Sequence, residues 1–135
     1  MSHFTVVRTT LRDEAMLCQA LADLGFPVVE AREEAQPLFG YQGDQRDETA
    51  EVILRREFVN PGSNDIGFKR NADGNFDAII SEFDSTRLNA TWLGQLSQRY
   101  ALAMVKATMA KQGYLVDAEQ LQANGSLRVV ARKFG

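Results

Sequence analysis

The spacing of apolar and polar positions changes several times along the chain, and each change marks a predicted element. Residues 3–11, HFTVVRTTL, are rich in β-branched side chains and predict a strand. Over residues 12–26 the apolar positions recur every three or four residues, which predicts a helix. Gly25 suits the left-handed residue that often follows a helix. A short strand is predicted next, over residues 26–30.

Residues 31–50 do not continue either spacing. The segment contains a proline, two glycines and more acidic residues than arginines, so we expect a mobile acidic loop. Leu38, Phe39 and Tyr41 are bulky side chains that a simple linker would not need. We therefore expect an apolar tip on this loop and hypothesise that it docks a partner. The alternative is that Phe39 and Tyr41 pack under the edge of the sheet, with a short strand around them.

The second half of the chain alternates strands with one long helix. Asn124-Gly125 is a strong signal for a tight turn between two strands. The broad apolar stripe of the long helix predicts packing against a sheet, with Tyr100 largely buried in that stripe. The predicted elements are a strand over 51–58, a hairpin over 66–71 and 76–83, a helix over 84–114 capped by Asp84, Ser85 or Thr86, and a closing hairpin over 114–121 and 127–134.

Two stretches of the chain resemble each other. AEVILRREF at 50–58 and SLRVVARKF at 126–134 each follow a helix, a glycine, an aromatic residue and a further strand. This order predicts a duplicated βαββ unit, although βαββ units also recur through geometry alone. The predicted fold is α+β: one domain over residues 1–135, with an antiparallel sheet of about six or seven strands and two helices on one face. Arg56 and Arg132 would then form a small basic patch if they meet across the sheet.

Composition narrows the class of protein. The chain has 135 residues, 44% hydrophobic and 24% charged, which is typical of a globular domain. Its net charge of −3 disfavours binding to nucleic acid. The sequence contains no apolar run of the ~20 residues needed to span a membrane, so no membrane association is expected. The single cysteine, Cys18, is interpreted as a small buried side chain in a reducing compartment.

Several short motifs stand in a characteristic order. The chain begins MSHF, and DIGF at 65–68, QRYA at 98–101 and KQGY at 111–114 follow, before the terminal NGSLRVVARKF. Together they resemble the cyanobacterial and plastid-encoded hypothetical reading-frame family, a conserved domain of unknown function. The resemblance covers essentially the whole chain. It implies photosynthetic microbes, plastids or phages of such hosts, and no established activity, substrate or cofactor. We expect a cytoplasmic location, or the plastid stroma for a plastid-encoded member.

Residues with catalytic or metal-binding chemistry are scarce. His3 is the single histidine, and one histidine with one cysteine cannot supply a usual metal site or a convincing nucleophile and base. GYQGDQ lacks the strand, lysine and helix of a phosphate-binding loop. We therefore expect no metal and no cofactor. The acidic residues of the 31–50 segment are interpreted as solvated, and no catalytic residue is assigned.

The candidate binding residues fall into two groups. Gln98, Arg99 and Tyr100 combine polar groups with an aromatic ring on the long helix, and His3 could lie at the rim of a pocket near it. Phe39 and Tyr41 form the other group. The sequence leaves enzymatic activity undecided but favours a non-enzymatic binding or adaptor module with a protein partner. The alternative is a small-ligand sensor or enzyme whose pocket lies between the long helix and the sheet.

Overall fold

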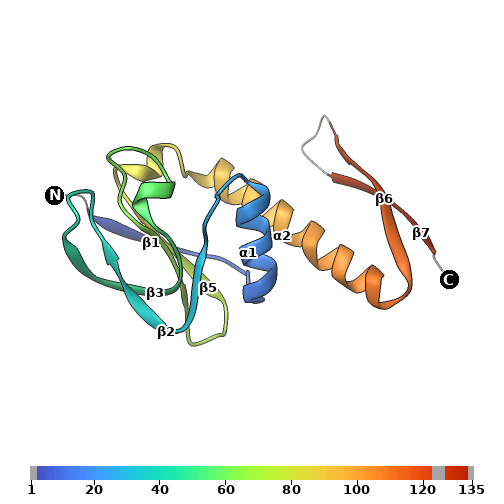
Figure 1. Cartoon of the computed structure of the whole chain (residues 1–135), viewed down its shortest axis with the longest axis horizontal. Helices are drawn as coiled ribbons and strands as arrows, with labels where there is room; N and C mark the ends of the chain where they lie inside the picture. The colour runs from blue at the N-terminus through green and yellow to red at the C-terminus, as the bar shows by residue number, and fades with distance from the viewer. Residues whose placement is uncertain (1–2, 123–126, 134–135) are drawn as a thin grey trace.

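In the computed structural model, which describes residues 3–122 and 127–133, two helices accompany a five-stranded antiparallel sheet and a separate two-stranded hairpin (Figure 1). The strand order in the sheet is β1-β5-β4-β3-β2, so β1 and β2 are its edges. The predicted α+β class is confirmed. The elements are β1 (Phe4–Arg8), α1 (Glu14–Asp23), β2 (Glu30–Phe39), β3 (Gln45–Leu54), the 3₁₀ helix η1 (Arg56–Phe58), β4 (Ile66–Arg70), β5 (Phe76–Ser81), the 3₁₀ helix η2 (Asp84–Thr86), α2 (Ala90–Lys111), β6 (Tyr114–Leu121) and β7 (Leu127–Lys133).

The predicted continuous sheet is divided in two. The order strand, helix, strand, strand does occur twice, as β1-α1-β2-β3 and as β5-α2-β6-β7, but the second hairpin forms its own sheet. The 22 residues of α2 span about 33 Å. This length carries β6 and β7 past the end of the five-stranded sheet (Figure 1). Arg56 in η1 and Arg132 in β7 therefore do not meet across one sheet.

Both helices pack on one face of the five-stranded sheet, as predicted. Leu17 and Leu21 from α1 and Leu96 from α2 join a single buried cluster with Val52 and Phe68 of the sheet. The helices begin where side chains satisfy free backbone N–H groups. Asp13 accepts from the backbone of α1 and Asn89 from that of α2. The cap of α2 is thus Asn89, whereas Asp84, Ser85 and Thr86 form η2 before it.

A second, smaller apolar cluster is formed by residues of β2, β3, β5 and β1 within the sheet. Leu38 is fully buried there with Ile53 and Ile79, and Phe4 of β1 packs against them. The guanidinium carbon of Arg46 lies 5.4 Å from the centroid of the Phe4 ring, so β3 reaches across to β1. This cluster gives the sheet a second small core.

The mobile loop predicted over residues 31–50 is wrong, because most of this segment forms β2 and β3. Pro37 lies in β2, an edge strand, where one side of the backbone needs no hydrogen-bond donor. The pairing with β3 is interrupted between Ala31 and Gln36 by an irregularity that accommodates the charged residues between them. An edge strand with an exposed acidic face therefore resembled a loop in sequence.

Two predicted strand boundaries also require correction. Of residues 26–30, predicted as a strand, only Glu30 is extended, because the chain first makes a turn after α1. The strand predicted over residues 51–58 ends at Leu54, and η1 follows. Both differences arise at chain reversals, which strand propensity alone does not locate.

Gly67 in β4 tests how tightly the side chains of β2 and β3 pack against this strand. A Cβ atom at this position in β4 would lie 2.8 Å from the Ala50 Cβ and 3.1 Å from the Leu38 side chain. We predict that Gly67→Ala lowers the free energy of unfolding by about 1–3 kcal/mol through overpacking. Gly94→Ala is the matched control, since nothing lies within 4 Å of a Cβ there and helix propensity should raise stability by about 1 kcal/mol. Urea unfolding curves measure both changes, and equal midpoints for the two variants would contradict the packing described.

Candidate functional site: a pocket beside Asp65

A cluster of buried polar side chains lies at one end of the five-stranded sheet. Asn64, Asp65, Ser81 and Asp84 are each no more than 1% exposed. The Asp84 carboxylate accepts hydrogen bonds from Ser81 Oγ at 2.7 Å and from the Asn64 backbone N–H at 3.1 Å. Each of these bonds offsets part of the cost of burying a charge. The cluster thereby fixes the loop before β4 against the start of η2.

Asp65 is the member of this cluster that joins separate parts of the chain. One carboxylate oxygen accepts from the backbone N–H of Phe39 at 2.8 Å and from Arg55 Nη1 at 2.8 Å. The other accepts from the backbone N–H of Arg56 at 2.7 Å. Three donors around one carboxylate make a set of short, charge-assisted bonds. Asp65 therefore fixes the end of β2 and the beginning of η1 relative to each other.

Arg55 is held by groups on every side. It forms ion pairs with Glu30 and Asp65 and donates to the carbonyl of Pro37. Its guanidinium carbon lies 5.6 Å from the centroid of the Phe39 ring. Burial alone would lower the pKa of Arg55, but hydrogen bonds and charge from Asp65 and Glu30 outweigh burial and raise it. Arg55 is consequently a fixed charge with its partners already in place.

An open pocket of about 440 Å³ lies over this arrangement. Arg56 is the cation that remains accessible in it. Its Nη1 donates to the Tyr41 carbonyl at 3.1 Å, and no described carboxylate forms an ion pair with it. The pocket can therefore receive a hydrogen-bond acceptor at Arg56 beside an aromatic ring. The lining residues are Glu30, Phe39, Gly43, Arg55, Arg56, Glu57 and Asp65.

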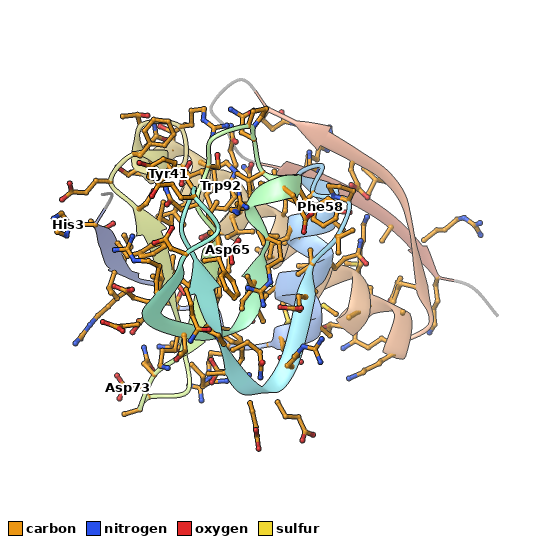
Figure 2. The ribbon with its side chains drawn as sticks, turned by 60° about the vertical axis from the view of Figure 1, so that its left-hand side comes forward. His3, Tyr41, Phe58, Asp65, Asp73 and Trp92 are labelled. Atoms are coloured by element: carbon orange, nitrogen blue, oxygen red, sulfur yellow. The ribbon has the colours of Figure 1, made fainter. Side chains whose placement is uncertain are left out.

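Three partly exposed aromatic residues, which we term the aromatic rim, lie on the chain segments that the same buried cluster fixes. They are Tyr41, Phe58 and Phe83, with exposed fractions of 40%, 39% and 59%. The backbone N–H of Tyr41 donates to Asn64 Oδ1 at 2.9 Å, and Phe83 directly precedes buried Asp84. Figure 2 shows Tyr41 and Phe58 at the same end of the molecule, with Asp65 below them. The rim is thus attached to the most constrained part of the loop structure.

The structure brings one group of sequence-predicted residues to this site. Phe39 lines the pocket, and the Tyr41 carbonyl accepts from Arg56 at its edge. His3 lies elsewhere, exposed at the start of β1, where its carbonyl accepts from the Glu82 backbone (Figure 2). Arg55, Arg56 and Asp65 were not predicted as site residues. The DIGF motif and the two arginines after an apolar strand were the available signals.

The residues predicted on the long helix have a different placement. Tyr100 is half-buried, and its hydroxyl accepts hydrogen bonds from the backbone N–H groups of Arg12 and Asp13 at 3.2 and 2.9 Å. The ring therefore connects α2 to the start of α1. Gln98 and Arg99 are half-buried beside it, and none of the three lines the Asp65 pocket.

A second open groove lies between α2 and β1, with a volume of about 420 Å³. It occupies the place predicted for a ligand pocket, but its walls do not include His3, Arg99 or Tyr100. They are formed by Val7, Arg8, Thr9, Thr10, Ala90, Leu93, Gly94 and Ser97. Over the described part of the chain, no three side chains of the His, Cys, Asp and Glu types gather as a metal site would require. Neither described helix is both long and apolar enough to cross a membrane.

Comparison with known proteins places the chain in a family. The family described as "Protein of unknown function (DUF1257)" matches residues 20–130. This chain belongs to the DUF1257 family. It is also 24% identical to "Uncharacterized protein ycf35" of Cyanophora paradoxa and 24% identical to the protein of the same name from Pyropia yezoensis, in each case over 99% of this chain and 98% of the relative. The resemblance to plastid-encoded reading frames is confirmed, and no solved structure matches this DUF1257 protein.

Replacing one oxygen of Asp65 tests the site. We predict that Asp65→Asn lowers the unfolding free energy of this DUF1257 protein by about 3–5 kcal/mol, because Arg55 loses a buried partner and an amide nitrogen would face N–H donors. Asp73→Asn, an exposed change in the β4–β5 turn, should shift stability by less than about 0.5 kcal/mol. Chemical denaturation gives both values. Similar effects of the two variants would show that Asp65 is not the central acceptor.

Cys18 provides a test of burial on the helical side. Desolvation, followed by the charge of Glu14, raises the pKa of its thiol. Thiolate is the reactive form, so we predict that iodoacetamide labels the folded protein at least about 10-fold more slowly at pH 8 than the urea-unfolded chain. The labelling rate should rise with pH at a higher midpoint in the folded protein. Equal rates would place the thiol in solvent.

Proposed function

We propose that this DUF1257 protein is a non-enzymatic binding module that serves as an adaptor in a protein complex of the cytoplasm or plastid stroma. The observation that carries this proposal is the aromatic rim together with Arg56, which is accessible and donates to the Tyr41 carbonyl. Tyrosine, phenylalanine and arginine are enriched at the centres of protein interfaces, where they contribute much of the binding energy. Three partly exposed rings on segments that one buried polar cluster fixes favour docking of another chain.

The support beneath the rim favours tight docking. Binding is weakened when loops must be ordered as they bind. Here the backbone of Tyr41 is hydrogen-bonded to Asn64, and Arg56 is fixed through its backbone to Asp65. Both residues therefore present their side chains from positions that are already ordered. A partner would not have to supply the energy to organise them.

The charges around the pocket suggest the chemistry of the partner. Arg56 can form a charge-assisted, two-point contact with a carboxylate. Glu57 is exposed beside it, and Glu30 also lines the pocket. These acids would repel a ligand of high negative charge. The site is therefore suited to one carboxylate flanked by apolar side chains, as in an extended protein segment, rather than to nucleic acid.

The groove between α2 and β1 supports a second candidate function, a sensor of a small ligand. It is lined by threonines and by small or apolar residues, and Gly94 leaves room within it. Gly94→Leu would fill this space without touching the aromatic rim. If Gly94→Leu abolishes a small-ligand response and leaves partner capture unchanged, the sensor is favoured. If a variant of the aromatic rim abolishes partner capture and leaves a small-ligand response unchanged, the adaptor is favoured.

The rim can be tested by matched substitutions. We predict that a Tyr41→Ser, Phe58→Ser, Phe83→Ser variant weakens partner binding at least about 30-fold, as expected when more than ~2 kcal/mol of contact energy is removed. Partners are captured from a DUF1257-containing host through a photo-crosslinking amino acid at position 41, and affinities are measured with the purified partner. Val28→Ser, which changes a side chain of 45% exposure away from the pocket lining, is the control.

The location of the cross-links decides the outcome. Partner peptides joined at position 41 should carry Asp or Glu next to apolar residues. Equal binding by the triple variant and the Val28 control, with both proteins folded, would refute docking at the rim.

A further inference from the structure

The C-terminal part of the chain, which we term the arm, stands apart from the five-stranded sheet. It comprises residues 104–122 and 127–133, that is, the end of α2 with β6 and β7 (Figure 1). Leu102 and Ala103 are the last buried residues of α2, and no described side chain within the arm is buried. Met104, Val105 and Val130 are 38–40% exposed. The arm thus presents three described apolar side chains to solvent.

In the described part of the chain, the β6–β7 hairpin of the arm pairs with no strand of the five-stranded sheet. β6 packs along α2, and Lys106 forms an ion pair with Glu119. An isolated two-stranded hairpin is marginally stable in water, and ordering each residue costs ~1–2 kcal/mol. The hairpin would gain most from a surface that pairs with its free edge and covers its apolar residues.

The edge strand β1 offers such a surface. The carbonyl of His3 accepts from the Glu82 backbone, so by the alternation of an antiparallel ladder Thr5 and Val7 pair with β5. The backbone groups of Phe4, Val6 and Arg8 then point away from the sheet. Val6 is 62% exposed. β1 therefore presents an apolar side chain and unpaired backbone groups together.

The two edges of the sheet differ in how they resist strand addition. β2 carries exposed charged residues, a proline and an interrupted pairing, which are the features that natural proteins use to block an edge. β1 pairs with β5 in unbroken register, contains no proline and ends in a single arginine. Only β1 is therefore open to another strand among the edges of the five-stranded sheet.

The arm and the remainder of the chain carry net charges of opposite sign. Residues 104–135 contain five Lys or Arg and two Asp or Glu, which gives a net charge of +3. Residues 1–103 contain ten Lys or Arg and sixteen Asp or Glu, which gives a net charge of −6. The arm is basic and the remainder of the same chain is acidic. In one molecule α2 holds the arm away from the sheet (Figure 1). The complementary pair is the arm of one copy and the body of another.

We propose that a second copy of this chain completes the fold by reciprocal exchange, with the β6–β7 hairpin of each copy against the β1 edge of the other. Each sheet would then gain two strands beside β1, which is the arrangement that the repeated strand-helix-strand-strand order anticipates. The exchange is symmetric, so it closes as a two-fold dimer. The aromatic rim consists of residues outside β1 and the arm.

Mixed cross-linking tests the exchange on the full-length chain. In a Cys18→Ser background, chains carrying Val6→Cys are mixed with chains carrying Val130→Cys under mild oxidation. Both positions are exposed, at 62% and 40%. We expect a disulfide-linked pair of the two different chains, at least about 10-fold more abundant than the pair formed with a Val28→Cys control chain. Light scattering should give twice the chain mass of 15.0 kDa.

Two further variants identify the forces involved. Val6→Pro removes an outward N–H from β1 and should weaken dimerisation at least about 10-fold, while circular dichroism verifies that the variant is folded. Raising the salt concentration to about 1 M should also weaken it, because the arm and body carry opposite charges.

Three outcomes would overturn the proposal. They are a mass of 15.0 kDa at the highest soluble concentration, disulfides only between two Val6→Cys chains, or an intramolecular disulfide in a Val6→Cys, Val130→Cys double variant. The first denies a second copy, the second indicates direct pairing of two β1 edges, and the third places the arm on its own body. None of them bears on the rim, which is tested separately.

Discussion

The buried Asp65 carboxylate determines how the loops of this protein are arranged. It accepts from the backbone of Phe39, the backbone of Arg56 and the side chain of Arg55, so one group connects β2 with the segment after β3. Arg55 extends this connection to Glu30 and to the Pro37 carbonyl. Without Asp65, Arg55 would retain its charge in a partly buried position but lose its most buried partner. The hairpin β2–β3 and the site at its end therefore depend on the same contact.

The neighbouring Asp84 has a complementary role. Its partners come from Ser81 at the end of β5 and from Asn64, which in turn accepts from Tyr41. Buried ionic and polar groups contribute little net stability compared with apolar packing, but they restrict the chain to one arrangement when every group is satisfied. Three short loops are held in register in this way. The buried polar groups therefore fix the backbone geometry beneath the proposed docking surface, although burying them carries a desolvation cost.

The sequence predicted those parts of the fold that depend on local spacing. The helical spacing of apolar residues, Leu17 and Leu21 among them, placed α1, and the strand-like stretches at 66–71 and 76–83 placed the β4–β5 hairpin. It failed for β2, whose glutamates and proline are compatible with an edge strand but resemble a loop. It also failed for the Asp65 site, because that carboxylate is 10 residues from Arg55 and 26 from Phe39. Contacts between distant segments leave no periodic pattern, whereas Phe39 and Tyr41 were recognisable as bulky residues in a polar context.

The position of β1 has a consequence for synthesis of the chain on the ribosome. Phe4 pairs with Ser81 and Arg8 with Asp77, so β1 cannot pair until β5 has been synthesised. At translation rates of ~5–20 residues per second, the nascent chain spends several seconds with this valine-rich segment unpaired. The intervening hairpins can form as they emerge, because their strands are close in sequence. Completion of the sheet is thus a late event in biogenesis, and a nascent-chain chaperone would find the amino-terminal strand exposed until then.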